Sequence, residues 1–446
     1  MKTILLSLLL LSSSLFAEEH YRTPIELPNV DRAMTTAGFW ISRHPSPDAV
    51  IMTTDNIDTW NFKNQQKGTK NIFSVIPAFN KTALVNTLQL SLQSTISQNL
   101  LTLSGTQADA SWFQNIAQEM DLDHLGSSLQ PCYGMIVHYT NQRVLPTNEG
   151  LYSATDASYC FGYFDQLQNS SLDVGTPVVI LHTSADRQWF YVATELSDGW
   201  IAAADIAVGT KAQIKNFTDT KSLAVVIKPH ADLYLDQEKT DYYDSVRMGT
   251  HLPLLSMTPH EANVMIPLAA ADGTLSLGVA TMNSKDIHQG FLPYTARSIY
   301  EQAFAMLNQP YGWGDSFGQQ DCSRFTQMVF ATVGIALPRN SGDQIGAGTL
   351  LTTFQATASV QERLSSFQSF PAGSTLLRPP GHIMLYLGTV NGIPYAIHDT
   401  TRFFSEDSTN TTVNFLNRVI VSDLSLQSPT NHLSYLQRLL SAVAIQ

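Results

Sequence analysis

The sequence predicts a multidomain α+β protein, with a mainly helical N-terminal domain, two small β-barrels and a C-terminal α+β domain. Its 446 residues are too many for one hydrophobic core, so several domains are expected. Two successive blocks of short alternating runs, separated by Gly, Asn and Asp turns, predict strands over residues 135–208 and 223–280. Such blocks favour two separate barrels over one sandwich. After residue 291 the pattern changes to helices followed by strands, which indicates a different fold at the C-terminal end.

The first residues, 1–17, are typical of a secretory signal peptide. Lys2 gives a positive start, residues 4–11 form an apolar run, and residues 12–17 provide a small-residue exit with predicted cleavage after Ala17. The apolar run is short for a transmembrane helix, and an uncleaved membrane anchor is the alternative. We therefore expect an exported protein, periplasmic or secreted, whose mature chain does not span the membrane.

Residues 18–125 are expected to form the mainly helical N-terminal domain. Apolar residues recur at helical spacing within 81–101, and a shorter helix is predicted over 109–120. The two strand blocks then divide the next part of the chain into a first barrel, 126–212, and a second barrel, 213–290.

The charge and the cysteines limit the classes of function. A formal net charge of −12 argues against nucleic-acid binding, because a phosphate backbone would be repelled. Of the three cysteines, Cys132 and Cys160 could pair in an exported protein and leave Cys322 free. Two buried unpaired thiols are the equal alternative. A single free thiol in an oxidising compartment points to a function for Cys322.

Cys322 stands at the predicted start of a helix in the C-terminal domain, residues 291–446. Asp321 is a suitable N-cap, and the face shared by Cys322, Phe325 and Val329 is apolar, so the thiol lies at the edge of a core. A helix N-terminus favours a thiolate, and we therefore expect a lowered pKa for this thiol. An inert buried thiol is the alternative for the residue taken alone.

Two histidines, His382 and His398, lie on a predicted hairpin around Asn391-Gly392. A two-residue turn would pair Leu385 with His398 and put the histidines on opposite faces. A three-residue loop would pair Met384 with His398 and bring the two rings together as diagonal neighbours. The alternation of apolar residues favours the second register, so we predict a bulged, odd-length loop.

A cysteine at a helix start with two imidazoles downstream predicts nucleophilic acyl transfer. Cys322 would attack a carbonyl, His382 would pair with the thiol and later protonate the leaving amine, and His398 would orient His382. The backbone N–H of Cys322 is a candidate oxyanion donor. A zinc site is the competing constellation, but the sequence lacks close-spaced ligand pairs, so we expect neither a metal nor another cofactor.

These residues resemble the NlpC-type peptidases that cut bacterial cell-wall peptides. The matching motifs are YGWG at 311–314, DCS at 321–323, LPRNS at 337–341, GH at 381–382, and His398. The likeness covers about residues 292–446 and implies a papain-like α+β peptidase domain. One branch of the family also carries an N-terminal stabilising domain and two bacterial SH3-like barrels. RVLPT at 143–147 and GWIAAADIA at 199–207 look like parts of the first of these barrels.

By resemblance, the substrate is a peptidoglycan stem peptide or muropeptide, cleaved between γ-D-glutamate and a diamino acid, which would be meso-diaminopimelate. Relatives with this layout often require a free amino group on L-alanine, and Asp321, Ser323 and Ser341 would bind that end. Tyr311 would line the cleft and assist the oxyanion. Further candidates from the first barrel are Glu149, Tyr152 and Glu195.

Arg324 departs from the family pattern, which usually has glycine two places after the nucleophile. Its side chain would point either to solvent or into the cleft, where it could pair with a substrate carboxylate. The second outcome would affect substrate choice more than catalysis.

The predicted function is a monomeric cysteine endopeptidase of peptidoglycan turnover or recycling. One alternative is a wall-binding scaffold whose peptidase domain is inactive, and another is an amidase or acyltransferase on the same fold. At least the first barrel is expected to narrow the cleft rather than to serve as a targeting module.

Overall fold

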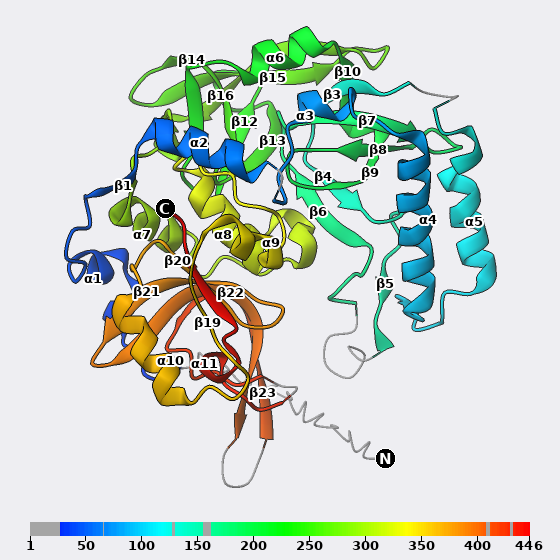
Figure 1. Ribbon diagram of the computed structural model, residues 1–446. Helices are drawn as coiled ribbons and strands as arrows, with labels where there is room; N and C mark the ends of the chain where they lie inside the picture. The colour runs from blue at the N-terminus through cyan, green and yellow to red at the C-terminus, as the bar shows by residue number, and fades with distance from the viewer. Residues whose placement is uncertain (1–26, 66, 127–129, 155–161, 407–410, 429–430) are drawn as a thin grey trace, which may run out of the picture.

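The structure is a computed structural model that describes residues 27–65, 67–126, 130–154, 162–406, 411–428 and 431–446 (Figure 1). The signal peptide predicted over 1–17 lies outside these ranges, as does Cys160 with its proposed pairing to Cys132. No helix within these ranges is long and apolar enough to cross a membrane.

The region before the first barrel is mainly helical, and the two helices predicted there are confirmed. Asn80 and Asp109 cap α4 and α5, each accepting a hydrogen bond from the backbone N–H group three residues later. The elements are η1 (Arg32–Thr35), α1 (Ala37–Ile41), β1 (Val50–Met52), α2 (Thr54–Asn64), α3 (Ile72–Val75), α4 (Lys81–Ser97), β2 (Leu101–Thr102), α5 (Ala110–Met120) and η2 (Leu122–His124).

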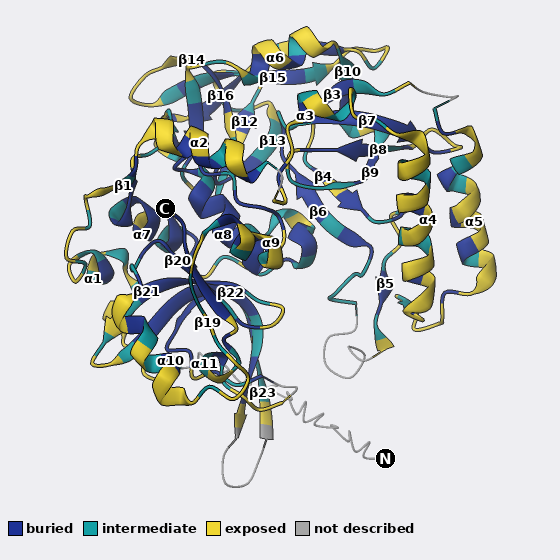
Figure 2. Cartoon of the chain, viewed as in Figure 1, coloured by how far each residue is buried: buried dark blue, intermediate teal, exposed yellow. Residues whose placement is uncertain are grey.

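The helices of this region divide between two neighbouring cores. The helices α4 and α5 bury Leu88 and Phe113 in the core of the barrels, and Figure 2 shows dark, buried segments on α5, whereas α4 is mostly exposed. In contrast, α1 and α2 bury Trp40 and Trp60 in the core of the C-terminal domain. The N-terminal segment therefore completes the core of the C-terminal domain, although both barrels lie between the two in the sequence.

Each of the two strand blocks forms a seven-stranded antiparallel sheet, and together they confirm the two predicted SH3-like barrels. The first has the order β10-β3-β7-β8-β9-β4-β6 and the second β13-β12-β16-β15-β14-β11-β17. The first contains β3 (Cys132–Ile136), β4 (Thr140–Arg143), β6 (Gln168–Leu172), β7 (Pro177–Thr183), β8 (Trp189–Ala193), β9 (Asp198–Ala202) and β10 (Ile206–Gly209), and β5 (Leu151–Tyr152) pairs with β2 outside it. The second contains β11 (Leu223–Val226), β12 (His230–Tyr234), β13 (Tyr242–Arg247), β14 (His251–Met257), β15 (Glu261–Ala269), β16 (Leu275–Asn283) and β17 (Ile287–Gln289). The helix α6 (Lys211–Thr218) joins the two barrels, with η4 (Ala203–Asp205) and η5 (Ser284–Asp286) as short turns.

The C-terminal domain packs helices on a six-stranded sheet of order β19-β24-β20-β21-β22-β23. The apolar face of α8 meets the sheet through Phe325 and Val329, which share a core with Leu385 and Ile397. Its strands are β18 (Tyr294–Thr295, paired with β1 outside the sheet), β19 (Thr349–Thr353), β20 (Thr375–Arg378), β21 (Met384–Val390), β22 (Ile393–Glu406), β23 (Thr411–Ser422) and β24 (Ser441–Ala444). Its helices are α7 (Ala296–Ala305), η6 (Trp313–Gly318), α8 (Cys322–Ala331), α9 (Ser341–Ala347), α10 (Val360–Ser366), η7 (Phe367–Ser369) and α11 (Tyr435–Arg438).

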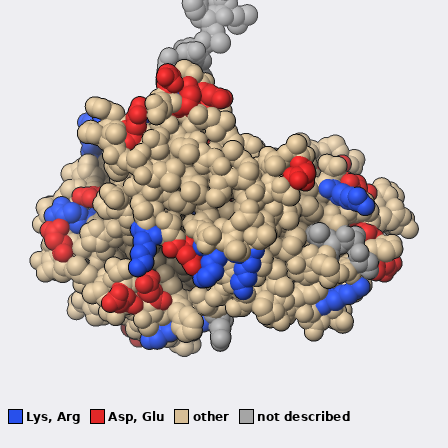
Figure 3. Space-filling view, turned by 90° about the horizontal axis from the view of Figure 1, so that it is seen from above, with Lys and Arg blue, Asp and Glu red and all other residues tan. Residues whose placement is uncertain are grey.

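Charged side chains are scattered on the face that Figure 3 shows. Basic residues there stand apart from one another or beside acidic ones, so this face offers no continuous basic surface for a phosphate backbone.

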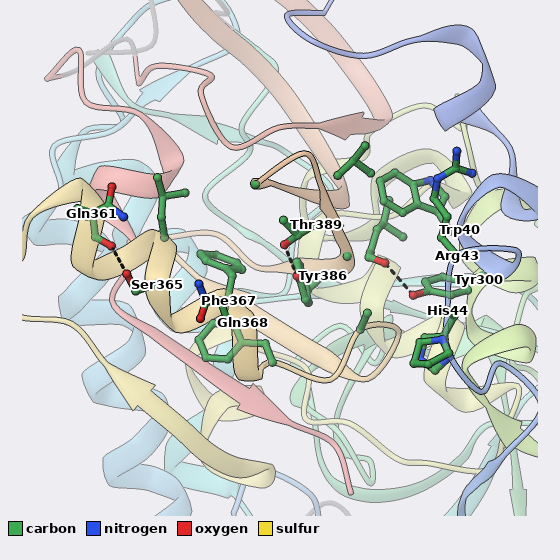
Figure 4. A pocket seen from close by; sticks show the side chains of 18 residues that line it. Trp40, Arg43, His44, Tyr300, Gln361, Ser365, Phe367, Gln368, Tyr386 and Thr389 are labelled. Carbon is green, nitrogen blue, oxygen red and sulfur yellow. Dashed lines mark hydrogen bonds between the residues drawn. The ribbon is translucent and has the colours of Figure 1, made fainter.

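Two of the cavities between the described elements are lined by neither Cys322, His382 nor His398. The larger, about 690 Å³, has Trp40 and Arg43 on one side and Phe367 and Gln368 on the other (Figure 4). The smaller, about 480 Å³, lies where both barrels meet the outer face of α8.

Candidate active site

Cys322 is the first residue of α8, as predicted. The Asp321 carboxylate caps this helix by accepting hydrogen bonds from the N–H groups of Ser323 and Arg324. The Cys322 thiol is buried and accepts a hydrogen bond from the backbone N–H of Ile383, the residue that follows His382. Because no described group accepts a hydrogen bond from the Cys322 N–H, this donor stays available beside the thiol.

The hairpin brings His382 and His398 together, but by a route different from the predicted one. The turn is the two-residue Asn391-Gly392 turn, with positive φ at both residues, and Val390 pairs with Ile393. The predicted odd-length loop is therefore wrong. An irregularity within β21, between Tyr386 and Gly388, supplies the extra residue instead, so that Leu385 pairs with Ile397.

This register gives the predicted facing of the side chains. The Leu385–Ile397 pair belongs to the register in which Met384 would stand opposite His398, the register that the apolar alternation favours. Ile397 points into the core beneath α8, and His398 therefore points to the other face of the sheet.

The two imidazoles and a serine form a hydrogen-bonded chain. His382 Nε2 lies 2.8 Å from His398 Nδ1, and His398 Nε2 lies 2.9 Å from the Ser422 hydroxyl of β23. A consistent assignment has each Nε2–H donating along the chain, which leaves His382 Nδ1 as a free acceptor. Ser422 carries no motif, and only its pairing with Ala396, two residues before His398, could have drawn attention to it.

Burial favours neutral forms of the thiol and of both imidazoles. It raises the pKa of the Cys322 thiol, and the Asp321 charge raises this pKa further, although the Ile383 N–H acts in the opposite direction. Burial also lowers the pKa of His382 to about 3, helped by Arg438 and opposed by Asp321. The direction for Cys322 is opposite to the expected helix-terminus effect, because desolvation outweighs it.

Tyr311 lies close to Cys322. Burial raises its pKa, and the Cys322 and Asp321 charges add to this rise, which places the phenol beside both residues. The Tyr163 hydroxyl from the first barrel donates to the Tyr311 carbonyl at 3.0 Å, and the two rings are stacked with centroids 6.4 Å apart.

A buried amide–carboxyl pair fixes this lead-in segment and was not foreseen. Gln320 donates through Nε2 to the Pro310 carbonyl at 2.8 Å and to Asp399 Oδ2 at 2.7 Å. Burial raises the pKa of Asp399 well above its ordinary value. Asp399 follows His398 and so points to the α8 side of the sheet, a facing that the hairpin register would have given.

Asp321 and Ser323, two predicted substrate-binding residues, are joined by Arg339. The Arg339 guanidinium donates to Asp321 Oδ2 at 2.8 Å, to Ser323 Oγ at 3.0 Å and to Asp315 Oδ1 at 2.9 Å. Burial alone would raise the pKa of Asp321, but the Arg339 charge and the hydrogen bonds hold it below its usual value. Arg339 belongs to the quoted LPRNS motif, yet no role was assigned to it from the sequence.

The other predicted binding residues are less closely joined to Cys322. Ser341 begins α9, and Gln344 of the same helix donates to the Ser323 carbonyl of α8 at 2.8 Å. No hydrogen bond from the Ser341 hydroxyl is found among the described residues. Glu149 accepts from Trp112 Nε1 at 2.6 Å, and Tyr152 lies in β5. Glu195 lines the smaller cavity, on the far side of α8 from the thiol.

Arg324 takes neither of the two predicted orientations. Its Nη2 donates to Asp173 Oδ2 of the first barrel at 3.0 Å, and its Nη1 donates to Gln327 Oε1 at 2.6 Å. The residue that replaces the usual glycine is therefore part of an interface between domains, away from the thiol.

The arrangement provides the parts that acyl transfer requires. A thiol and an unused backbone N–H lie at the start of α8, and the neutral imidazole of His382, steadied by His398, belongs to the residue before Ile383, whose N–H acts on the thiol. Within the described ranges no cluster of three or more His, Cys, Asp or Glu side chains is arranged to hold a metal ion.

Family comparisons agree with the positions of these parts. An SH3 domain of the SH3b1 type matches residues 162–202, and the NlpC/P60 family matches residues 308–425. The second range contains Cys322, His382, His398 and Ser422.

Two curated relatives match shorter stretches. A gamma-D-glutamyl-L-lysine dipeptidyl-peptidase of Bacillus cereus is 30% identical over 128 residues, which are 27% of this chain and 35% of that protein. The bifunctional muramidase/DL-endopeptidase CwlT of Bacillus subtilis is 38% identical over 63 residues, 14% of this chain and 19% of that protein. The chain thus spans about a third or less of the length of these two relatives.

A solved structure shares the whole architecture. An NlpC/P60 endopeptidase from Photobacterium damselae subsp. piscicida superposes with a TM-score of 0.76 at 19% identity, covering 92% of this chain and 96% of that one. The chain therefore carries an NlpC/P60 domain, of a family of cysteine peptidases, over residues 308–425, and an SH3b1-type domain ahead of it over residues 162–202.

Proposed function

We propose that this protein is a cysteine endopeptidase that hydrolyses the bond between γ-D-glutamate and a diamino acid, meso-diaminopimelate, in peptidoglycan stem peptides. The observation that carries the proposal is the Cys322 thiol at the start of α8, on which the backbone N–H of Ile383 acts, together with the hydrogen-bonded His382, His398 and Ser422 side chains that begin one residue before Ile383. The names of the two curated relatives, a gamma-D-glutamyl-L-lysine dipeptidyl-peptidase and a bifunctional muramidase/DL-endopeptidase, support a bond between γ-D-glutamate and a diamino acid.

In the first step His382 Nδ1 takes the proton from the Cys322 thiol while the sulfur attacks the γ-carbonyl carbon. The carbonyl oxygen becomes an oxyanion, which the Cys322 N–H and the Tyr311 phenol stabilise. The imidazolium then gives its proton to the amino nitrogen of the diamino acid, the C–N bond breaks, and a thioester remains. His398 holds the His382 ring through both transfers.

In the second step His382 takes a proton from water, whose oxygen attacks the thioester carbon. The C–S bond breaks, the sulfur regains a proton from His382, and the γ-carboxylate of glutamate leaves. Both neutral partners are then restored, in keeping with the pKa directions of Cys322 and His382.

We further propose that Asp321, Ser323 and Ser341 bind the free amino group of the N-terminal L-alanine. Asp321 keeps a negative charge beside the thiol, because Arg339 holds its pKa low, and a carboxylate in that state suits an ammonium group. The expected boundaries, 18–125, 126–212, 213–290 and 291–446, and export of the chain after removal of residues 1–17, belong to the same proposal.

The test is digestion of L-Ala-γ-D-Glu-meso-diaminopimelate followed by mass spectrometry. The intact chain should release L-Ala-D-Glu, Cys322→Ala should release none, and Cys132→Ala should act as the intact chain does. An N-acetylated peptide should be cut much more slowly if the free amino group is required. Cleavage by folded Cys322→Ala would remove the proposal.

The SH3b-type domain favours one second candidate, a wall-binding scaffold. Retention on insoluble sacculi without release of peptide would support the scaffold, and product release would exclude an inactive domain. An amidase or acyltransferase would cut or form a different bond, which the same mass spectra would report.

A further inference from the structure

The one-turn helix α11 lies over the paired histidines. The Tyr435 ring is stacked on the His382 imidazole, with centroids 5.3 Å apart and planes 22° apart. The same ring meets His398 edge-on, at 5.2 Å and 82°. One aromatic side chain therefore contacts both imidazoles of the chain and fixes the angle between them.

Arg438 lies behind this ring. Its guanidinium carbon is 4.9 Å from the Tyr435 centroid, in cation–π geometry, and its Nε donates to the Leu433 carbonyl at 3.2 Å. The charged and titratable groups that act on His382 are Arg438, which disfavours the imidazolium, and Asp321, which favours it. His398 and the Cys322 thiol also lie near the stack: burial raises the pKa of Tyr435, and a negative charge on Cys322 would raise it further.

The segment that carries these two residues is held firmly. Ser434 and Gln437 form a capping box, and the backbone N–H groups of Tyr435 and Leu436 donate to the carbonyls of Leu426 and Leu424. The Tyr435 hydroxyl lies 3.1 Å from Thr400 Oγ1 of β22. The NlpC/P60 family match ends at residue 425, so α11 and its Tyr435 and Arg438 lie outside the matched part of the chain.

We propose that Tyr435 and Arg438 are positioning residues for the reaction: the Tyr435 ring fixes the plane of the His382 imidazole, and the Arg438 charge keeps that imidazole ready to accept the thiol proton. This inference rests on the proposed function. The inference deepens the proposed function, because it makes α11 responsible for the orientation and the basicity of His382.

The effect of Arg438 has a definite direction. A positive charge near His382 lowers the pKa of the imidazole, so removal of the charge raises it. The acid limb of kcat/KM follows the protonation of this base in the free enzyme and should move to higher pH in Arg438→Gln. It should move further in Arg438→Glu, which reverses the charge.

The effect of Tyr435 depends on the ring and not on its hydroxyl. Tyr435→Phe keeps the stack and should retain kcat within about twofold, whereas Tyr435→Leu should lower kcat about tenfold or more with little change in KM. Arg43→Gln is the matched control, because it also removes a guanidinium from an aromatic ring, that of Phe39, on the edge of the larger cavity.

A second readout does not need activity. In Cys322→Ala, the titration of the two coupled histidines is followed by 15N NMR, with and without Arg438→Gln. The apparent pKa of His382 should rise when Arg438 is removed and stay the same in the Arg43→Gln control.

The two claims can fail separately. If the intact chain cuts no stem peptide but the NMR shift is seen, the proposed function fails and the assignment of Arg438 stands. If peptides are cut while Arg438→Gln keeps the pH profile and Tyr435→Leu keeps kcat, the positioning role is overturned. Folding of each variant is checked by its thermal unfolding midpoint, and Tyr435→Phe keeps the test open if Tyr435→Leu does not fold.

Discussion

Arg324 of α8 and Asp173 of the first barrel form an ion pair, with Nη2 3.0 Å from Oδ2. Arg247 of the second barrel binds the same carboxylate, through Nη2 at 2.8 Å and Nε at 3.0 Å. One buried carboxylate thus joins three domains, and the side chain that replaces the glycine of the family pattern fixes the peptidase domain to both barrels.

Replacing Asp173 should destabilise the junction. We expect Asp173→Asn to lower the free energy of unfolding by about 3–5 kcal/mol, since it leaves the buried Arg247 with only the more distant Asp315 carboxylate, 3.8 Å away, as counter-ion. Arg324→Gln should cost less, because Asp173 keeps Arg247. Urea unfolding measures both, and equal costs for the two variants would contradict this account.

The same junction gives a pH dependence. Burial alone would raise the pKa of Asp173, but Arg247 and Arg324 hold it below its ordinary value. Its stabilising effect is therefore complete above the unfolded pKa of about 3.9 and is lost as the pH falls through the lower folded value. Thermal unfolding between pH 7 and pH 3 should fall more steeply for the natural chain than for Asp173→Asn.

Alkylation should show that the resting thiol is neutral. Because the pKa of Cys322 is raised, iodoacetamide should label it slowly at pH 7 and faster as the pH rises. Labelling is followed by peptide mass spectrometry, which separates Cys322 from Cys132. A rate that stays high down to pH 5 would instead indicate a thiolate–imidazolium pair.

His398 and Ser422 should affect kcat to different degrees. We expect His398→Ala to lower kcat on the order of 10²-fold, because His382 loses the partner that fixes its tautomer. Ser422→Ala removes only the outer hydrogen bond and should cost about tenfold or less. Initial rates on the stem peptide measure both effects. A larger loss of kcat in Ser422→Ala than in His398→Ala would contradict the proposed order of importance in the hydrogen-bonded series.

Asp399 should reduce stability at high pH. Since burial raises its pKa, the folded chain retains a proton that the unfolded chain loses above about pH 4, and stability falls as the pH rises beyond that value. Asp399→Asn keeps the contact with Gln320 and should remove this slope at a cost below about 1 kcal/mol near pH 5. A variant with the slope of the natural chain would show that Asp399 is charged.

The sequence predicted the parts of the site that depend on local rules. Asp321 is a good N-cap, and an apolar face behind it placed Cys322 at the start of α8 and at the edge of the core. The facing of His398 followed from the alternation along β22. These features depend on neighbours a few residues apart, which periodicity and capping describe well.

Features that depend on distant contacts were not predictable. The sequence predicts an extra residue in the hairpin but does not show whether it lies in the loop or in β21, because a longer turn and a strand bulge change the register equally. The partner of Arg324 lies about 150 residues earlier, and Tyr435 reaches His382 only through the fold of the C-terminal segment. No spacing rule joins such residues.

The pairing of Val50 with Thr295, and the burial of Trp40 beneath the same domain, has a consequence for biosynthesis. The earliest part of the chain to leave the ribosome must wait until about 245 further residues have been made before its partner strand exists. During that interval its tryptophans are exposed, which makes the nascent chain a client for chaperones. A peptidase domain expressed without residues 27–60 would lack part of its own interior and should be recovered mainly as insoluble protein.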